Sequence, residues 1–71
     1  MGYEYVIETS NTGRPGRTLH TKKKADAATA LADYTSPTMA ATLLSNAENN
    51  GVAHYQTQRG ANIDVYWQEE D

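Results

Sequence analysis

The chain has 71 residues, a formal net charge of −3 at pH 7 and no cysteine. Its length limits it to one small domain, expected over residues 1–71, and the lack of cysteine excludes disulfides and thiolate metal sites. The N-terminal residues do not form a secretory signal, and no segment approaches the roughly 20 apolar residues of a membrane span. We therefore expect a soluble, cytoplasmic protein without a membrane partner.

A hairpin is expected at the start of the chain. Residues 3–9 alternate between two faces and are rich in β-favouring side chains, which is typical of a half-buried strand. Residues 10–16 contain Ser, Asn, Gly and Pro, which predict a long, mobile turn. Residues 17–21 are then expected to form a short second strand with Leu19 facing the core.

Two helices are expected next. The alanine-rich residues 22–34 predict a helix with Thr21 as its N-cap. Ser36 followed by Pro37 is a specific signal for the start of a second helix, which ends near Gly51. The expected apolar face of the first helix consists of Ala27, Ala28, Leu31 and Tyr34. That of the second consists of Met39, Ala40, Leu43, Leu44 and Ala47.

Two further strands are expected over residues 52–58 and 62–68, joined by a tight turn. In the last strand, Ile63, Val65 and Trp67 alternate with polar residues and are expected to face the core. The order strand, strand, helix, helix, strand, strand (ββααββ) predicts an α+β fold. We expect a small antiparallel sheet of about four strands with both helices packed on one face.

Positive charge is concentrated between residues 14 and 24, which hold five of the six basic residues. Three lysines are expected in the first turn of helix 22–34, where they oppose the helix dipole at roughly 0.3–1 kcal/mol each. Any one lysine can be a solvated surface residue, but the cluster favours a binding role towards an acidic partner surface. The expected contact residues are Arg14, Arg17, Lys22, Lys23 and Lys24, with Tyr66 as the exposed aromatic residue.

The main alternative is a small nucleic-acid-binding protein that uses the same basic segment, because clustered Lys and Arg bind phosphates. The acidic overall charge argues against it. So does the lack of a helix-turn-helix, zinc-finger, RRM or KH pattern. Direct binding to nucleic acid is therefore expected to be weak at most.

Catalysis has little support in the sequence. The segment around Gly13 and Gly16 lacks the spacing of a phosphate-binding loop, and no nucleophile elbow is present. His20, His54 and Asp64 could share the sheet face opposite the helices, so a metal-dependent enzyme at His20 and His54 is the third hypothesis. No ligand spacing supports it, and we expect no enzyme activity, no catalytic residues, no cofactor and no metal.

In general character, the chain resembles small phage-encoded inhibitor proteins of the anti-CRISPR type. It is short, compact and cysteine-free, lacks a catalytic motif and has a polarised charge pattern. The likeness involves no shared motif, so no site residue follows from it. It implies a non-enzymatic protein that binds a larger host protein or nucleoprotein complex and blocks it in the cytoplasm of the host cell. A small binding protein of this inhibitor kind is the function we expect.

Overall fold

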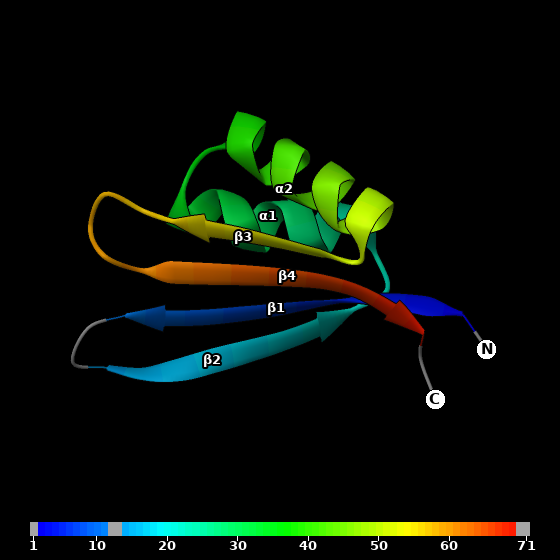
Figure 1. The fold of residues 1–71 in the computed structure, drawn as a ribbon, viewed down its shortest axis with the longest axis horizontal. Coiled ribbons are helices and arrows are strands. Elements are labelled where there is room, and N and C mark those ends of the chain that lie inside the picture. Colours follow the sequence, from blue (N-terminus) through cyan, green and yellow to red (C-terminus); the bar gives the residue numbers. More distant parts are fainter. Residues whose placement is uncertain (1, 12–13, 70–71) are drawn as a thin grey trace.

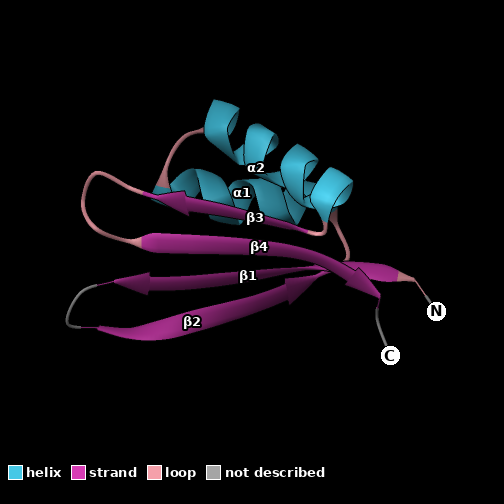
Figure 2. Cartoon of the chain, in the orientation of Figure 1, coloured by secondary structure: helices cyan, strands magenta, loops and turns pink. Residues whose placement is uncertain are grey.

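The computed structural model describes residues 2–11 and 14–69, and the side chains of residues 14 and 15 are not among the described atoms. One antiparallel sheet has both helices on the same side (Figures 1 and 2). The α+β fold with the order ββααββ is therefore confirmed. Its elements are β1 (Tyr3–Asn11), β2 (Arg14–Thr21), α1 (Lys24–Tyr34), α2 (Pro37–Asn50), β3 (Val52–Gln56) and β4 (Asn62–Glu69).

The sheet has the strand order β2-β1-β4-β3, and every neighbouring pair is antiparallel. The first and last strands of the chain are therefore the central strands, and each hairpin supplies one central strand and one edge strand. Ile7 of β1 lies opposite Leu19 of β2 and Val65 of β4. Because side chains alternate along a strand, this register places all three on the helix side.

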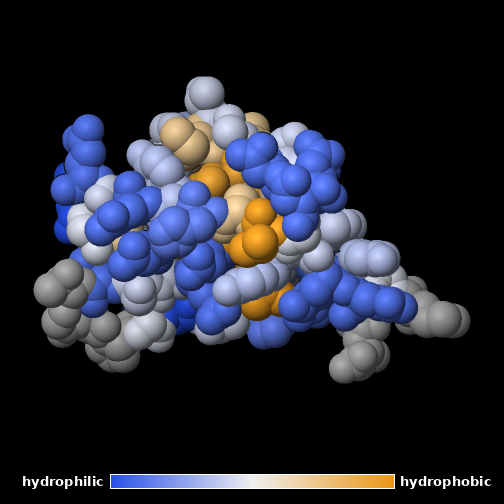
Figure 3. All heavy atoms as spheres, viewed as in Figure 1, coloured by the Kyte–Doolittle hydropathy of each residue, from blue (hydrophilic) through white to orange (hydrophobic). Residues whose placement is uncertain are grey.

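The core lies between the sheet and the two helices. Its four largest fully buried side chains are Leu31, Leu44, Ile63 and Val65. Trp67 packs against this core and contacts Tyr5, with ring centroids 4.4 Å apart, which confirms that it faces inward. Hydrophilic side chains cover most of the view in Figure 3, and hydrophobic atoms reach the surface near its middle.

The second helix begins and ends where the sequence predicts. Ser36 is its N-cap, and the Ser36 Oγ accepts a hydrogen bond from the Met39 N–H at 3.1 Å. Pro37 is the first helical residue, and Gly51 ends the helix with a φ of 88°, in the left-handed region that favours glycine. The expected apolar face is buried, apart from the half-buried Met39.

The first helix begins later than expected. It starts at Lys24, with Lys23 rather than Thr21 at the N-cap position, and no side chain caps it. Thr21 still belongs to β2, where it lies opposite Tyr5, so the ladder holds it in an extended conformation. The Thr21 Oγ1 accepts a hydrogen bond from the Lys23 N–H at 3.2 Å, which turns the chain before the helix.

The expected turn over residues 10–16 is also wrong, because β1 continues to Asn11 and β2 already begins at Arg14. Only Thr12 and Gly13 remain between the strands, and they lie outside the described residues. The mobility expected of the turn therefore stays a prediction. The pairing shifts between Thr9 and Asn11, so that two residues of β2, 15 and 16, oppose one of β1. This is a β-bulge. Proline is tolerated at a bulge in an edge strand, because its missing N–H then removes no hydrogen bond from the ladder.

The apolar face of α1 is narrower than expected. Ala27 and Leu31 are fully buried and Ala28 is half-buried, but Tyr34 is 41% exposed. The strand expected over residues 52–58 ends at Gln56. It stops early because the Thr57 carbonyl oxygen accepts from the Gly60 N–H of the turn at 3.0 Å, while the Ala61 N–H donates to the Thr57 Oγ1 at 3.1 Å.

Candidate functional site

The expected basic segment lies along β2, an edge strand of the sheet. Arg14 is the first residue of β2, and its side chain lies outside the described part of the chain. Arg17 is exposed within the strand, whereas Lys22 and Lys23 are exposed beyond its other end. A strand rises about 3.3 Å per residue, so the segment extends over roughly 25 Å. The structure therefore arranges these cations as a line rather than as a compact cluster.

Tyr66 does not lie with the basic residues. It is on β4 opposite Val6, which places it on the face of the sheet that the helices leave uncovered. Arg17 lies opposite the buried Thr9 and is therefore on the helix side. The structure thus separates Tyr66 from Arg17 by the thickness of the sheet, and the expected contact residues do not form one patch.

Lys24 has a structural role that the sequence did not indicate. Its Nζ lies 3.1 Å from the Glu48 Oε1 atom, and the Tyr5 hydroxyl donates to the same oxygen at 2.5 Å. The contact joins α1, α2 and β1. Burial, followed by the hydrogen bond to Glu48, raises the pKa of Tyr5 to about 12. The hydrogen bonds from Tyr5 and then Lys24 lower the pKa of Glu48.

This contact changes the argument from the helix dipole. Only Lys24 lies in the first turn of α1, where Asp26 provides the negative charge that suits a helix N-terminus. The expectation of three lysines in that turn is wrong, because β2 holds the chain extended through Thr21. Lys24 is explained by its ion pair, so the case for a partner contact depends on Arg17 and Lys23.

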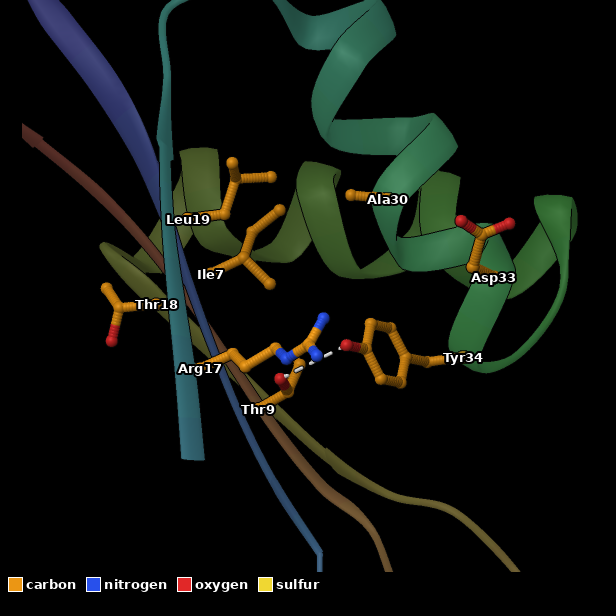
Figure 4. A pocket seen from close by; sticks show the side chains of 8 residues that line it. All are labelled: Ile7, Thr9, Arg17, Thr18, Leu19, Ala30, Asp33 and Tyr34. Atoms are coloured by element: carbon orange, nitrogen blue, oxygen red, sulfur yellow. Dashed lines mark hydrogen bonds between the residues drawn. The ribbon is translucent and has the colours of Figure 1, made fainter. Parts of the chain in front are cut away.

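A groove of about 290 Å³ lies between β2 and the C-terminal half of α1 (Figure 4). The side chains of Ile7 and Leu19 point from the sheet towards the helix, and Ala30 points back from α1. Leu19 is 41% exposed although it faces the helices as expected. The groove stays open because the short alanine side chain does not fill the space above β2.

Polar groups form the rim of this groove. The Thr9 Oγ1 donates a long hydrogen bond of 3.5 Å to the Tyr34 hydroxyl, whose ring lies at one end of the groove. Arg17 extends from β2 towards that ring, and Asp33 lies on the helix side (Figure 4). The arrangement combines an apolar floor with a cation on the strand side, and it can hold an apolar side chain next to a carboxylate.

The outer edge of β2 presents main-chain groups to solvent. The Trp67 N–H donates to the Gly51 carbonyl oxygen at 3.0 Å, so odd-numbered residues of β4 bond towards β3. Hydrogen-bonded and non-hydrogen-bonded pairs alternate in an antiparallel ladder. The even-numbered residues of β4 therefore bond to β1, and the odd-numbered residues of β1 bond to β2. It follows that the N–H and C=O groups of Thr18 and His20 point away from the sheet.

The two histidines lie on the uncovered face, as expected, but on opposite edge strands. His20 Nδ1 is 2.6 Å from a Glu4 carboxylate oxygen, and His54 Nδ1 is 2.6 Å from an Asp64 carboxylate oxygen. The strand order, which the sequence did not reveal, places β1 and β4 between them. The structure therefore brings His54 and Asp64 together but keeps His20 apart from them. Residues 2–11 and 14–69 contain no group of three potential metal ligands.

The centre of the uncovered face is acidic. Glu8 lies directly opposite Asp64 across β1 and β4, and like charges in that position destabilise a sheet. Asp64 and then Glu8 raise the pKa of the neighbouring Tyr66. Tyr66 thus lies in a negative environment, which does not suit the acidic partner that the sequence led us to expect for it.

Sequence reasoning missed the groove. It assigned Tyr34 to the buried stripe of α1 and did not single out Thr9 or Asp33. A weak signal was present, because the aromatic Tyr34 stands at the end of a helix whose other inward residues are mostly alanine. Such a helix covers little of an adjacent strand.

Comparisons with protein-family models, with curated proteins and with solved structures found no match to this chain. Neither helix of the part described by the structure combines the length and apolarity needed to cross a bilayer.

Proposed function

We propose that the chain is a small, non-enzymatic protein-binding domain that recognises an acidic surface through the β2 side of the molecule. The observation that carries the proposal is the coincidence of positive charge with an uncovered sheet edge. Arg17 is exposed within β2, and Lys23 is exposed just beyond the C-terminal end of that strand. Within the described residues, the outer side of β2 has no neighbouring strand. Recognition by such edges combines main-chain hydrogen bonds with charge attraction.

A protein fits this surface better than nucleic acid. The cations form a line along one edge, and the adjoining sheet face carries Glu4, Glu8 and Asp64, which repel phosphates. Few phosphate contacts are available, so binding to nucleic acid is expected in the non-specific range of about 10⁻⁴–10⁻⁶ M at physiological salt. Inhibition of a larger host complex, which the general resemblance to anti-CRISPR proteins implies, is the expected consequence of binding.

Affinity capture from host lysate with matched charge reversals tests this proposal. Arg17→Glu reverses the charge of an exposed cation in β2, whereas Arg59→Glu makes the same charge change in the exposed turn between β3 and β4. We expect a partner that the parent and Arg59→Glu retain and that Arg17→Glu loses, with capture unaffected by nuclease. Binding of the purified partner should weaken as salt rises, because exposed charges are screened within about 8 Å at physiological ionic strength.

Two results would contradict the proposal. Equal capture by the parent and Arg17→Glu would show that β2 is not the contact surface. Loss of capture after nuclease treatment would instead favour the nucleic-acid alternative. Circular dichroism of both variants, with thermal unfolding, checks that the charge reversals leave the fold intact.

A further inference from the structure

The free edge of β2 and the groove beside it form a continuous feature. Thr18 and His20 direct their main-chain donors and acceptors outward, and Leu19 between them forms part of the groove floor on the helix side. An extended chain that pairs with β2 would place every second side chain on that same side. One of those side chains would lie beside Leu19 and under α1.

The size of the groove limits what it can hold. Its volume of about 290 Å³ is at the lower end of the roughly 300–1,000 Å³ typical of small-ligand pockets. It therefore suits one or two side chains of a strand rather than a folded surface. Ile7, Leu19 and Ala30 line its floor, so the inserted side chain is apolar.

The charges around the groove indicate which residues of the bound segment should flank its apolar side chain. Arg17 lies at the strand side of the groove, and the lysines follow at the other end of β2. Asp33 lies across the groove on α1, so an incoming carboxylate is favoured along β2 and disfavoured along the helix. An acidic residue two positions from the apolar one would lie on the same side and within reach of Arg17.

The same charges disfavour a second copy of this chain as the occupant. Pairing of β2 with another β2 would bring two lines of Arg and Lys side by side, and like charges on paired strands destabilise a sheet. The bulge at residues 15 and 16 interrupts the ladder, so the regular edge available to a partner runs from Arg17 to Thr21.

We infer that the acidic partner binds as an extended segment of about five residues that adds a strand to β2, inserts an apolar side chain into the groove between β2 and α1, and sets a carboxylate against Arg17. The inference rests on the proposed function and specifies how that function is carried out. Main-chain pairing at Thr18 and His20 and the apolar side chain in the groove are contacts that general charge attraction does not require, so experiments can test them separately.

Peptide selection provides the probe. A library of random heptapeptides is selected on the immobilised 71-residue chain, and the enriched peptides are synthesised and measured by fluorescence anisotropy. We expect an enriched pattern of an apolar residue with Asp or Glu two positions away. Failure to enrich any peptide, or enrichment without acidic residues, would overturn the inference.

Matched variants then locate the peptide. Ala30→Leu fills the groove and is expected to weaken binding roughly tenfold, whereas Ala41→Leu on the exposed side of α2 leaves it unchanged. Thr18→Pro removes an outward N–H without touching the β1 ladder and should weaken binding about two- to tenfold, the effect of one hydrogen bond. His54→Pro removes an outward N–H from the other edge strand and should bind like the parent.

Hydrogen exchange measured by NMR gives a test that needs no variant. On addition of a selected peptide, the amides of Thr18 and His20 should exchange more slowly. Those of Val52 and His54, which point outward from the other edge strand by the same alternation, should not change. Absence of protection at Thr18 and His20 would refute strand addition. If partner capture still depended on Arg17 in that case, the proposed function would stand and only strand addition would be wrong. Capture independent of Arg17 would contradict both the proposed function and strand addition.

Discussion

The two halves of the sheet differ in how completely the helices cover them. Over β3 and β4, α2 presents Leu43 and Leu44, which are almost completely buried together with Val65. Over β1 and β2, α1 presents mostly alanine, and Leu19 is left 41% exposed beside an open groove. Apolar burial is the dominant favourable term in folding, so we expect the side chains buried under α2 to contribute more to stability than Leu19 beside the groove.

Truncation of one leucine in each half should give the largest difference. Leu44→Ala leaves a cavity in the fully packed half and is expected to lower the free energy of unfolding by about 2–5 kcal/mol. Leu19→Ala removes a side chain that is already partly in water and should cost less than about 1 kcal/mol. Urea unfolding followed by circular dichroism measures both, and equal losses would contradict the comparison.

Tyr5 links the two halves, because it lies on β1 and bonds to Glu48 of α2. Its pKa is raised from 10.0 to about 12 in the folded chain, so the neutral hydroxyl is favoured by folding. The stability it contributes is complete below pH 10 and is lost as pH rises through about 12. We expect Tyr5→Phe to flatten this alkaline decline in unfolding experiments between pH 9 and 12. An unchanged decline would assign it to the other tyrosines and the lysines.

The N-terminus of α2 has a side-chain cap, whereas that of α1 has no side-chain cap hydrogen bond, so the better-packed half of the molecule also has the better-capped helix. Ser36→Ala removes the N-cap of α2 and should cost about 1 kcal/mol. Lys23→Ser adds a cap to α1, where none exists and where the extended backbone suits one, and should raise stability by about 0.5–1 kcal/mol. Thermal unfolding of the two variants should show shifts of opposite sign. A loss of stability in Lys23→Ser would mean that Lys23 already stabilises the helix start.

Neighbouring lysines should respond differently to charge reversal, with the smallest effects of the series. Lys24→Glu places a carboxylate beside Glu48 and should lower stability by about 0.2–1 kcal/mol, the range for exposed ion pairs. Lys23→Glu should stay within about 0.5 kcal/mol of the parent. The low-salt difference between them should shrink in 1 M salt. A difference that salt does not reduce would rule out the ion pair as its cause.

Local signals made much of the fold predictable from sequence. Ser36 and Pro37 start α2 through contacts within four residues, and Gly51 ends it by a backbone preference of its own. The alternation in β4 placed Ile63, Val65 and Trp67 correctly for the same reason. Each of these features depends on a few adjacent residues, so no knowledge of the tertiary structure was needed.

Features that depend on distant residues were not predictable. The start of α1 at Lys24 follows from the pairing of Thr21 with Tyr5, and the role of Lys24 depends on a carboxylate at Glu48. The separation of His20 from His54 follows from a strand order that alternation within single strands does not encode. The groove likewise results from how far α1 reaches over β2, which is a property of packing.

The bulge in β2 affects how the protein behaves at high concentration. An exposed sheet edge is a template on which further chains can stack, and proteins interrupt such edges with proline, charge or irregular pairing. Here residues 15 and 16 break the register, and a Cβ on Gly16 would come within 3.1 Å of the Thr9 carbonyl oxygen, so the two strands run close together at this point. Beyond the bulge, an incoming chain cannot continue regular hydrogen bonding. We therefore expect the bulge to limit the growth of extended, fibril-like sheets on this edge, because regular pairing is confined to residues 17–21.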